Sequence, residues 1–205
     1  VERQVRVYRK VVRLIILLTS TLVLGLIGCA DAMIEVLIGP KWLPAAHYLR
    51  ILGISGMFLP LILSSVNVFN ANGKSDITLL LEIIKTALAV IPVTLGIIFD
   101  IDALLWGMVG ITLLSYLIHA AFVSKEIPYS VGQQVRDILP PIVISACMAV
   151  AVHFVGMVEM APFPLLLLQI AVGFVIVLVC YEFICPSEEY TELKGMVLKV
   201  LHLKK

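Results

Sequence analysis

Residues 51–71 read ILGISGMFLPLILSSVNVFNA, a run of 21 residues without a charged side chain. The hydrocarbon core of a bilayer is about 30 Å thick, and a helix needs about 20 apolar residues to cross it. Backbone polar groups must be paired inside hydrocarbon, and a helix pairs them within its own segment. The run is therefore predicted to be a membrane-spanning helix.

Five other stretches of the chain have a similar length and apolar character. The composition agrees with them, because 61% of the 205 residues are hydrophobic, 14% are charged and the mean hydropathy is +1.09. We predict an all-α polytopic membrane protein with a basic leader (1–13), a six-helix transmembrane lobe (14–184) and an amphipathic tail (185–205). The six spans are expected at 14–38, 46–71, 77–99, 103–123, 138–158 and 161–184.

Pro60 lies well inside the second of these spans, and Pro92 lies well inside the third. Proline has no backbone N–H and clashes with the preceding turn, so both helices are expected to bend at these positions.

Lysine and arginine are distributed unequally between the two sides of the predicted bundle. With six spans, both tails and the second and fourth loops share one side, and these segments hold twelve cations, against Lys41 alone on the other side. Short cytoplasmic loops carry the excess of cations, so both ends of the chain are predicted to be cytoplasmic. The leader and the tail mix cations with apolar residues at helical spacing, which favours helices that lie on anionic membrane lipids.

Several function classes are disfavoured by the residues. A net charge of +1 offers no cationic surplus for a nucleic-acid partner. No HExxH, GxSxG or GxxxxGK[ST] motif is present, so no catalytic residue and no enzymatic activity are predicted. The four histidines are far apart and the four cysteines form no CxxC pair, so we expect no metal site and reduced cysteines.

Glu82 and Lys85 are candidate functional residues because they lie within the third span. An ionisable side chain at bilayer depth costs about 3 kcal/mol or more unless it contacts water or a partner. The i, i+3 spacing places both on one face, close enough for an ion pair. Two interpretations stay open: a structural pair between helices, or the lining of a hydrophilic cavity that holds a charged substrate or couples transport to protons or sodium.

Three further residues near the second span are candidates for a substrate cavity. Arg50 precedes the uncharged run and is expected near the outer surface, where it can also reach lipid phosphates. Asn67 and Asn70 share a helix face by i, i+3 spacing and can either hydrogen-bond between helices or line a path.

The segment GPKWLPAAHYLRILGISGMFLPLILSSVNVFNANGKSDITLLLEIIK, residues 39–85, resembles a known family. The likeness rests on Gly39 and Trp42, the region 49–52, the turn NGKSD at 72–76 and the run LEIIK at 81–85. The basic leader and VRDILPP at 135–141 add to it, so that nearly the whole chain is covered. The family is the polysaccharide-transporter (Wzx-type) branch of the multidrug/oligosaccharidyl-lipid/polysaccharide (MOP) flippase superfamily.

The resemblance implies a fold and a function. Members have twelve to fourteen helices in two lobes that rock between inward-open and outward-open states, and the present six helices correspond to the carboxy-terminal lobe. The resemblance implies a bacterial inner-membrane flippase that moves undecaprenyl-diphosphate-linked oligosaccharides for O-antigen, capsule or exopolysaccharide assembly. Its partners would be the lipid-linked oligosaccharide, membrane lipids and the amino-terminal lobe, without a cofactor other than a coupling ion.

Two other functions remain open from the sequence. One is a drug or small-molecule antiporter of the same superfamily, which the charges within the spans do not distinguish from a flippase. The other is a membrane scaffold of a glycan-assembly complex that transports nothing, in which Glu82 and Lys85 would be sealed away from water.

Overall fold

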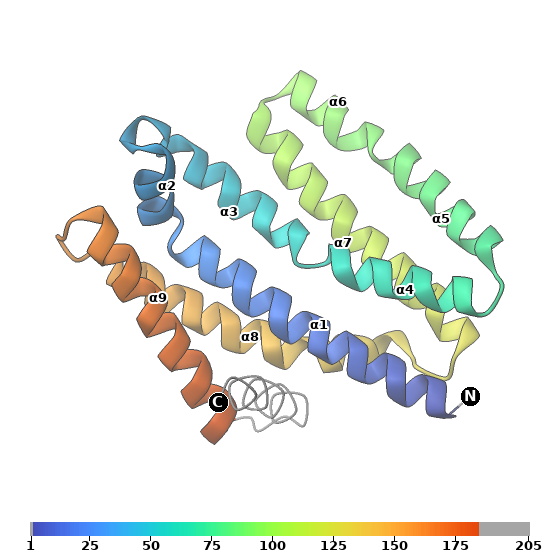
Figure 1. The fold of residues 1–205 in the computed structure, drawn as a ribbon. Coiled ribbons are helices and arrows are strands. Elements are labelled where there is room, and N and C mark those ends of the chain that lie inside the picture. Colours follow the sequence, from blue (N-terminus) through green and yellow to red (C-terminus); the bar gives the residue numbers. More distant parts are fainter. Residues whose placement is uncertain (1, 185–205) are drawn as a thin grey trace, which may run out of the picture.

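The computed structural model describes residues 2–184, and this part of the chain is helical without a strand (Figure 1). Six helical spans within it are long and apolar enough to cross a membrane. The predicted all-α, multi-pass membrane architecture is therefore confirmed. The predicted amphipathic tail, 185–205, lies outside the described residues.

The six spans contain more than six helices because three of them are interrupted. A short 3-10 turn (Pro40–Trp42) and a final π-helical turn (Cys180–Ile184) complete the described part. The helices are α1 (Glu2–Gly28), α2 (Ala30–Ile38), α3 (Pro44–Gly56), α4 (Leu59–Ala71), α5 (Ser75–Leu88), α6 (Val90–Ile98), α7 (Ile101–Glu126), α8 (Val131–Val155) and α9 (Pro162–Val179).

Two of the interruptions occur at the prolines singled out in the sequence. The second span breaks at Met57 and Phe58, just before Pro60, and the third breaks at Ala89, three residues before Pro92. In each case the missing proline N–H removes one hydrogen bond to the preceding turn. Helix α8 also contains Pro140 and Pro141, yet it runs on without a break.

The first span differs in extent from the predicted one. Helix α1 begins at Glu2, so the basic leader and the first part of the predicted span form one continuous helix. No glycine or proline occurs before Gly25 to stop the helix. At its other end α1 stops at Gly28, and α2 continues after Cys29 in a different direction (Figure 1).

The helices form an array with α9 at one edge and α5 and α6 at the other (Figure 1). Helix α1 packs along α8, and α7 packs against α6, α3 and α4. Glycines permit two of the close approaches. A Cβ at Gly28 would lie 2.8 Å from the Ala149 carbonyl oxygen, and one at Gly107 would lie 2.8 Å from the Pro92 Cβ. The backbones of α1 and α8 thus approach to a distance that only glycine accommodates.

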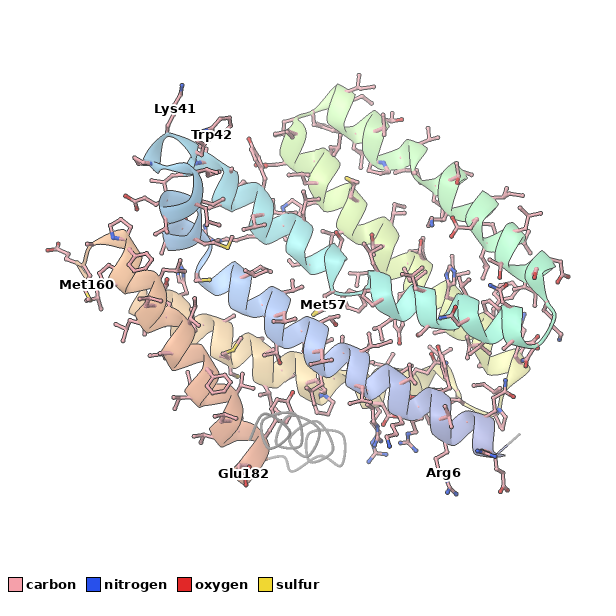
Figure 2. The ribbon with its side chains drawn as sticks, in the orientation of Figure 1. Arg6, Lys41, Trp42, Met57, Met160 and Glu182 are labelled. Atoms are coloured by element: carbon pink, nitrogen blue, oxygen red, sulfur yellow. The ribbon has the colours of Figure 1, made fainter. Side chains whose placement is uncertain are left out.

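Two ends of the bundle can be distinguished. One end contains residues 2–13, the α4–α5 turn and the α7–α8 segment, and we call it the basic end. It is joined by hydrogen bonds from Gln4 to Asn72 and from Lys74 to Glu126. Arg6 and Glu182 lie towards this end, and Lys41, Trp42 and Met160 at the opposite end (Figure 2).

Candidate functional site

The predicted pair of Glu82 and Lys85 is formed on α5. Lys85 Nζ lies 2.6 Å from Glu82 Oε2 and 2.8 Å from Oε1. The side chains are 46% (Glu82) and 42% (Lys85) exposed on the surface of the described residues, so they are not packed into the interior of this bundle. Each charge lowers the cost of holding the other at bilayer depth, and half of the pair's surface is open to a further partner or to water.

A buried histidine of α7 lies near this ion pair. His119 is 1% exposed and close enough to Glu82 and Lys85 to interact electrostatically with both. Its Nδ1 donates to the Ser115 carbonyl oxygen at 2.8 Å, which leaves Nε2 as the acceptor nitrogen. Within residues 2–184 this Nε2 atom is buried without a hydrogen-bond partner. The sequence alone shows His119 only as one of four histidines that lie far apart along the chain.

The other three predicted site residues do not form one site with the Glu82–Lys85 pair. Arg50 forms an ion pair with Asp31 across α2 and α3. Asn70 and Asn67 are both exposed on α4, and the Asn70 side-chain oxygen accepts from Ser75 and Thr78 at 3.4 and 3.3 Å, which ties the α4–α5 turn together. Arg50 and Asn70 are about 30 Å apart along their span at 1.5 Å per residue.

The most extensive polar cluster lies at the basic end and was not predicted. Asp137 of α8 is 4% exposed and receives hydrogen bonds from two arginines of α1. Arg9 donates from Nε and Nη2 at 2.5 and 2.9 Å, and Arg13 donates from Nη2 at 2.6 Å. The Tyr129 hydroxyl donates to the same carboxylate at 2.7 Å. We call Arg9, Arg13, Tyr129 and Asp137 the arginine clamp.

The clamp is continuous with further buried polar groups. Tyr8 meets the Tyr129 ring edge-on at 6.0 Å, and its hydroxyl hydrogen-bonds the Ser65 hydroxyl of α4 at 3.0 Å. Burial and the hydrogen bond to the neighbouring Asp137 carboxylate raise the pKa of Tyr129 well above its usual range. The phenol therefore stays protonated and remains a donor. The clamp fixes the first turns of α1 to α8 and to the α7–α8 segment.

A weak signal for the clamp is present in the sequence. Arg9 and Arg13 share a helix face by i, i+4 spacing, and Asp137 follows shortly after the fourth loop, on the same predicted side of the membrane. From the sequence, all cations of residues 1–13 were expected at the membrane surface. Which cations face the lipid and which face α8 depends on how α1 packs, and the cation count does not contain that information.

Metal-ligating side chains do not gather in the part of the chain that the structure describes. No group of three or more His, Cys, Asp or Glu residues there lies close enough to hold a metal ion. Cys29, Cys147 and Cys180 are free thiols.

Comparison with known proteins gives one relevant similarity. No family model matches the chain, and no solved structure matches it. In an alignment 198 positions long that covers 91% of this chain, it is 24% identical to the teichuronic acid biosynthesis protein TuaB of Bacillus subtilis (strain 168). The matched part is 39% of that protein, so the chain spans about two fifths of its relative's length. The chain is thus a multi-pass membrane protein that is similar to a teichuronic acid biosynthesis protein.

Proposed function

We propose that this chain is the carboxy-terminal six-helix lobe of a flippase that moves a lipid-linked oligosaccharide across the bacterial inner membrane by alternating access. The observation that carries the proposal is the similarity to TuaB over 91% of the chain, because that protein's name refers to the biosynthesis of a cell-surface polysaccharide. The matched 39% of TuaB agrees with a chain that represents one lobe of a two-lobe protein.

The structure supplies elements that such a transporter needs. A lipid diphosphate is anionic, so its passage requires cations that face a wet space while the polyprenyl tail stays in lipid. Lys85 provides a cation within a span, held by Glu82 and half exposed on the surface of the described bundle. Proline-interrupted spans such as α3–α4 and α5–α6 supply positions at which helices can bend during rocking.

The proposal assigns an orientation to the bundle. The basic end lies in the cytoplasm, because it carries the excess of Lys and Arg among short connecting segments. The half-exposed face that includes Glu82 and Lys85 faces the substrate path between the two lobes. Glu82 either serves as the ion-pair partner of Lys85 or couples the transport to protons or sodium.

Polymer export in a strain that lacks the chromosomal gene tests this function. The strain is complemented with the full-length protein carrying Lys85→Ala, Lys85→Arg or Lys41→Ala, and surface polymer is measured at equal protein abundance. Lys85→Ala is expected to lower export at least about tenfold, the effect of losing one charge-assisted contact of about 1.5 kcal/mol. Lys85→Arg keeps the charge and should retain most of the export, and Lys41→Ala, an exposed lysine at the opposite end, should retain all of it.

Other outcomes distinguish the remaining functions. Normal export by Lys85→Ala would remove this residue from the substrate path. Drug sensitivity of the deletion strain without a polymer defect would instead favour the antiporter. Loss of polymer on deletion, combined with full activity of every variant at positions 82 and 85, would favour the scaffold. Unchanged export by Glu82→Gln over a range of pH would count against ion coupling through Glu82.

A further inference from the structure

Three neighbouring side chains of α7 are buried with an unpaired polar atom. Within residues 2–184, no hydrogen-bond partner exists for Ser115 Oγ, the Tyr116 hydroxyl or His119 Nε2. The three residues are 3%, 4% and 1% exposed, respectively. Buried polar atoms are nearly always paired, so three of them in residues 115–119 of one helix need an explanation.

His119 is the base of this group. A carbonyl oxygen can only accept, so the contact of Nδ1 with the Ser115 carbonyl oxygen places the ring hydrogen on Nδ1 and a lone pair on Nε2. Histidine gains and loses a proton near physiological pH, whereas serine and tyrosine hydroxyls do not. The ring is therefore held with its free lone pair inside the bundle, where it can take up one proton.

Glu82 and Lys85 of α5 lie at about the depth of His119. Glu82 follows the first residue of α5 by seven positions, and His119 precedes the last residue of α7 by seven, so each lies about 10 Å from that helix end at 1.5 Å per residue. The two helix ends meet at the basic end, where Lys74 Nζ donates to Glu126 at 2.8 Å. The charges of Glu82 and Lys85 act on the His119 ring from this position.

The other described helices that pack against α7 do not place a further charge next to the ring. Helices α4 and α6 contain no charged side chain. On α8, Asp137 is held by the arginine clamp on the side of α1, and the neighbouring Arg136 is exposed. The other titratable groups of α3 and α8 lie towards the opposite end of the bundle, and they are His47, Tyr48, Arg50, Cys147 and His153.

The ion pair on α5 is able to share the carboxylate with a second cation. Both Glu82 oxygens contact Lys85 Nζ, and the two side chains are almost half exposed. An ionised carboxylate accepts about four hydrogen bonds, so Glu82 keeps acceptor capacity while it holds Lys85. A protonated imidazole beside it would find a counter-ion of opposite charge.

We propose that His119 Nε2 is an internal proton-binding site, in which Glu82 is the counter-ion of the protonated ring and Lys85 is the cation that opposes protonation. The proton comes from water at the open side of Glu82 and adds to the lone pair of Nε2, and no other bond is broken. Glu82 then divides its charge between two cations, so its hold on Lys85 weakens. The inference goes beyond the proposed function, because proton binding does not depend on what the protein transports.

Nuclear magnetic resonance of the purified full-length protein, labelled with nitrogen-15 in its histidine rings, tests the inference. The nitrogen chemical shifts distinguish a ring nitrogen that carries hydrogen from one that does not. The His119 signals are identified by their loss in His119→Gln or, by elimination, from variants of the other three histidines. We expect Nε2 to become protonated reversibly as the pH is lowered from about 8 to about 5. A ring that stays neutral over this range in the folded protein would overturn the inference.

Two charge variants should change the protonation of His119 in opposite directions. At the pH that half-protonates the wild type, Glu82→Gln leaves Lys85 alone beside the ring and should lower the ratio of protonated to neutral His119 about tenfold. Lys85→Met leaves Glu82 alone and should raise the ratio about tenfold. The matched control is Asp76→Asn, an exposed carboxylate in the first turn of α5, which should change the ratio by less than about twofold.

The opposite signs separate an electrostatic site from a general disturbance of the bundle. The inference is overturned if both variants change the ratio in the same direction, or if either leaves it within twofold of the wild type. If one variant is not recovered folded, the other is compared with Glu82→Gln combined with Lys85→Met, which removes both charges and should restore the ratio to within about threefold. The expected shifts together with normal export by Lys85→Ala would keep this inference and remove Lys85 from the proposed substrate path.

Discussion

Removal of the Asp137 carboxylate tests how strongly the arginine clamp stabilises the bundle. Asp137→Ala deletes the acceptor of four hydrogen bonds, two from Arg9, one from Arg13 and one from Tyr129. Breaking a buried ion pair from one side costs about 3–5 kcal/mol, because the remaining charge is left without compensation.

The cost here should be lower than that range. The Arg9 and Arg13 side chains are 42% and 34% exposed, so both guanidinium groups regain part of their hydration when Asp137 is removed. The buried Tyr129 hydroxyl loses its acceptor and cannot regain water as easily. We expect a destabilisation of about 2–3 kcal/mol, which corresponds to a fall in Tm of about 4–12 °C for a domain of this size.

Thermal unfolding of the purified protein in detergent, followed by loss of the folded peak in size-exclusion chromatography, measures this effect. Asp102→Ala is the matched control, because Asp102 also forms a pair, with His47, but is 46% exposed. Exposed pairs contribute about 0–1 kcal/mol, so the control should shift Tm by only a few degrees. In an Arg9→Gln and Arg13→Gln background, Asp137→Ala should cost less than in the wild type, because its two charged partners are already gone and only the hydrogen bond from Tyr129 remains to be lost.

Two results would refute this account of the clamp. One is an Asp137→Ala shift no larger than that of Asp102→Ala. The other is full additivity of Asp137→Ala with the two arginine substitutions, which would mean that these groups do not interact in the folded protein.

Three further predictions concern packing, a surface pair and pH. Gly28→Ala places a methyl group 2.8 Å from the Ala149 carbonyl oxygen and should cost about 1–3 kcal/mol, whereas Gly110→Ala, with no atom within 4 Å, should be neutral or slightly stabilising in the same unfolding assay. Asp31→Asn removes an exposed pair with Arg50 and should cost less than about 1 kcal/mol, and the difference from wild type should shrink in high salt. The pKa of Tyr129 is higher in the folded state than in the unfolded state, so the phenol contributes its full stabilisation below about pH 10 and less as the pH rises further. Between neutral pH and about pH 11, the wild type should therefore lose more of its free energy of unfolding than Tyr129→Phe.

The membrane architecture was predictable from the sequence because it depends on length and polarity alone. A run such as 51–71 has to be helical in hydrocarbon whatever its neighbours are, since no other arrangement pairs its backbone within one segment. Bends near Pro60 and Pro92 were predictable because a proline ring lacks the backbone N–H, although α8 continues without a break through Pro140 and Pro141. The Glu82–Lys85 pair follows from i, i+3 spacing on one helix.

The arginine clamp depends on contacts between segments far apart in the chain. Arg9 and Asp137 are separated by 128 residues, and only the packing of α1 along α8 brings them within hydrogen-bond distance. Counting cations shows that the first thirteen residues are basic, but it cannot show that two of them turn inward to a buried carboxylate while Arg6 lines a cavity. Local spacing and hydrocarbon thickness thus determined the number and helical type of the membrane spans. Which charges are buried was decided by the rotation of each helix about its own axis, which its neighbours fix.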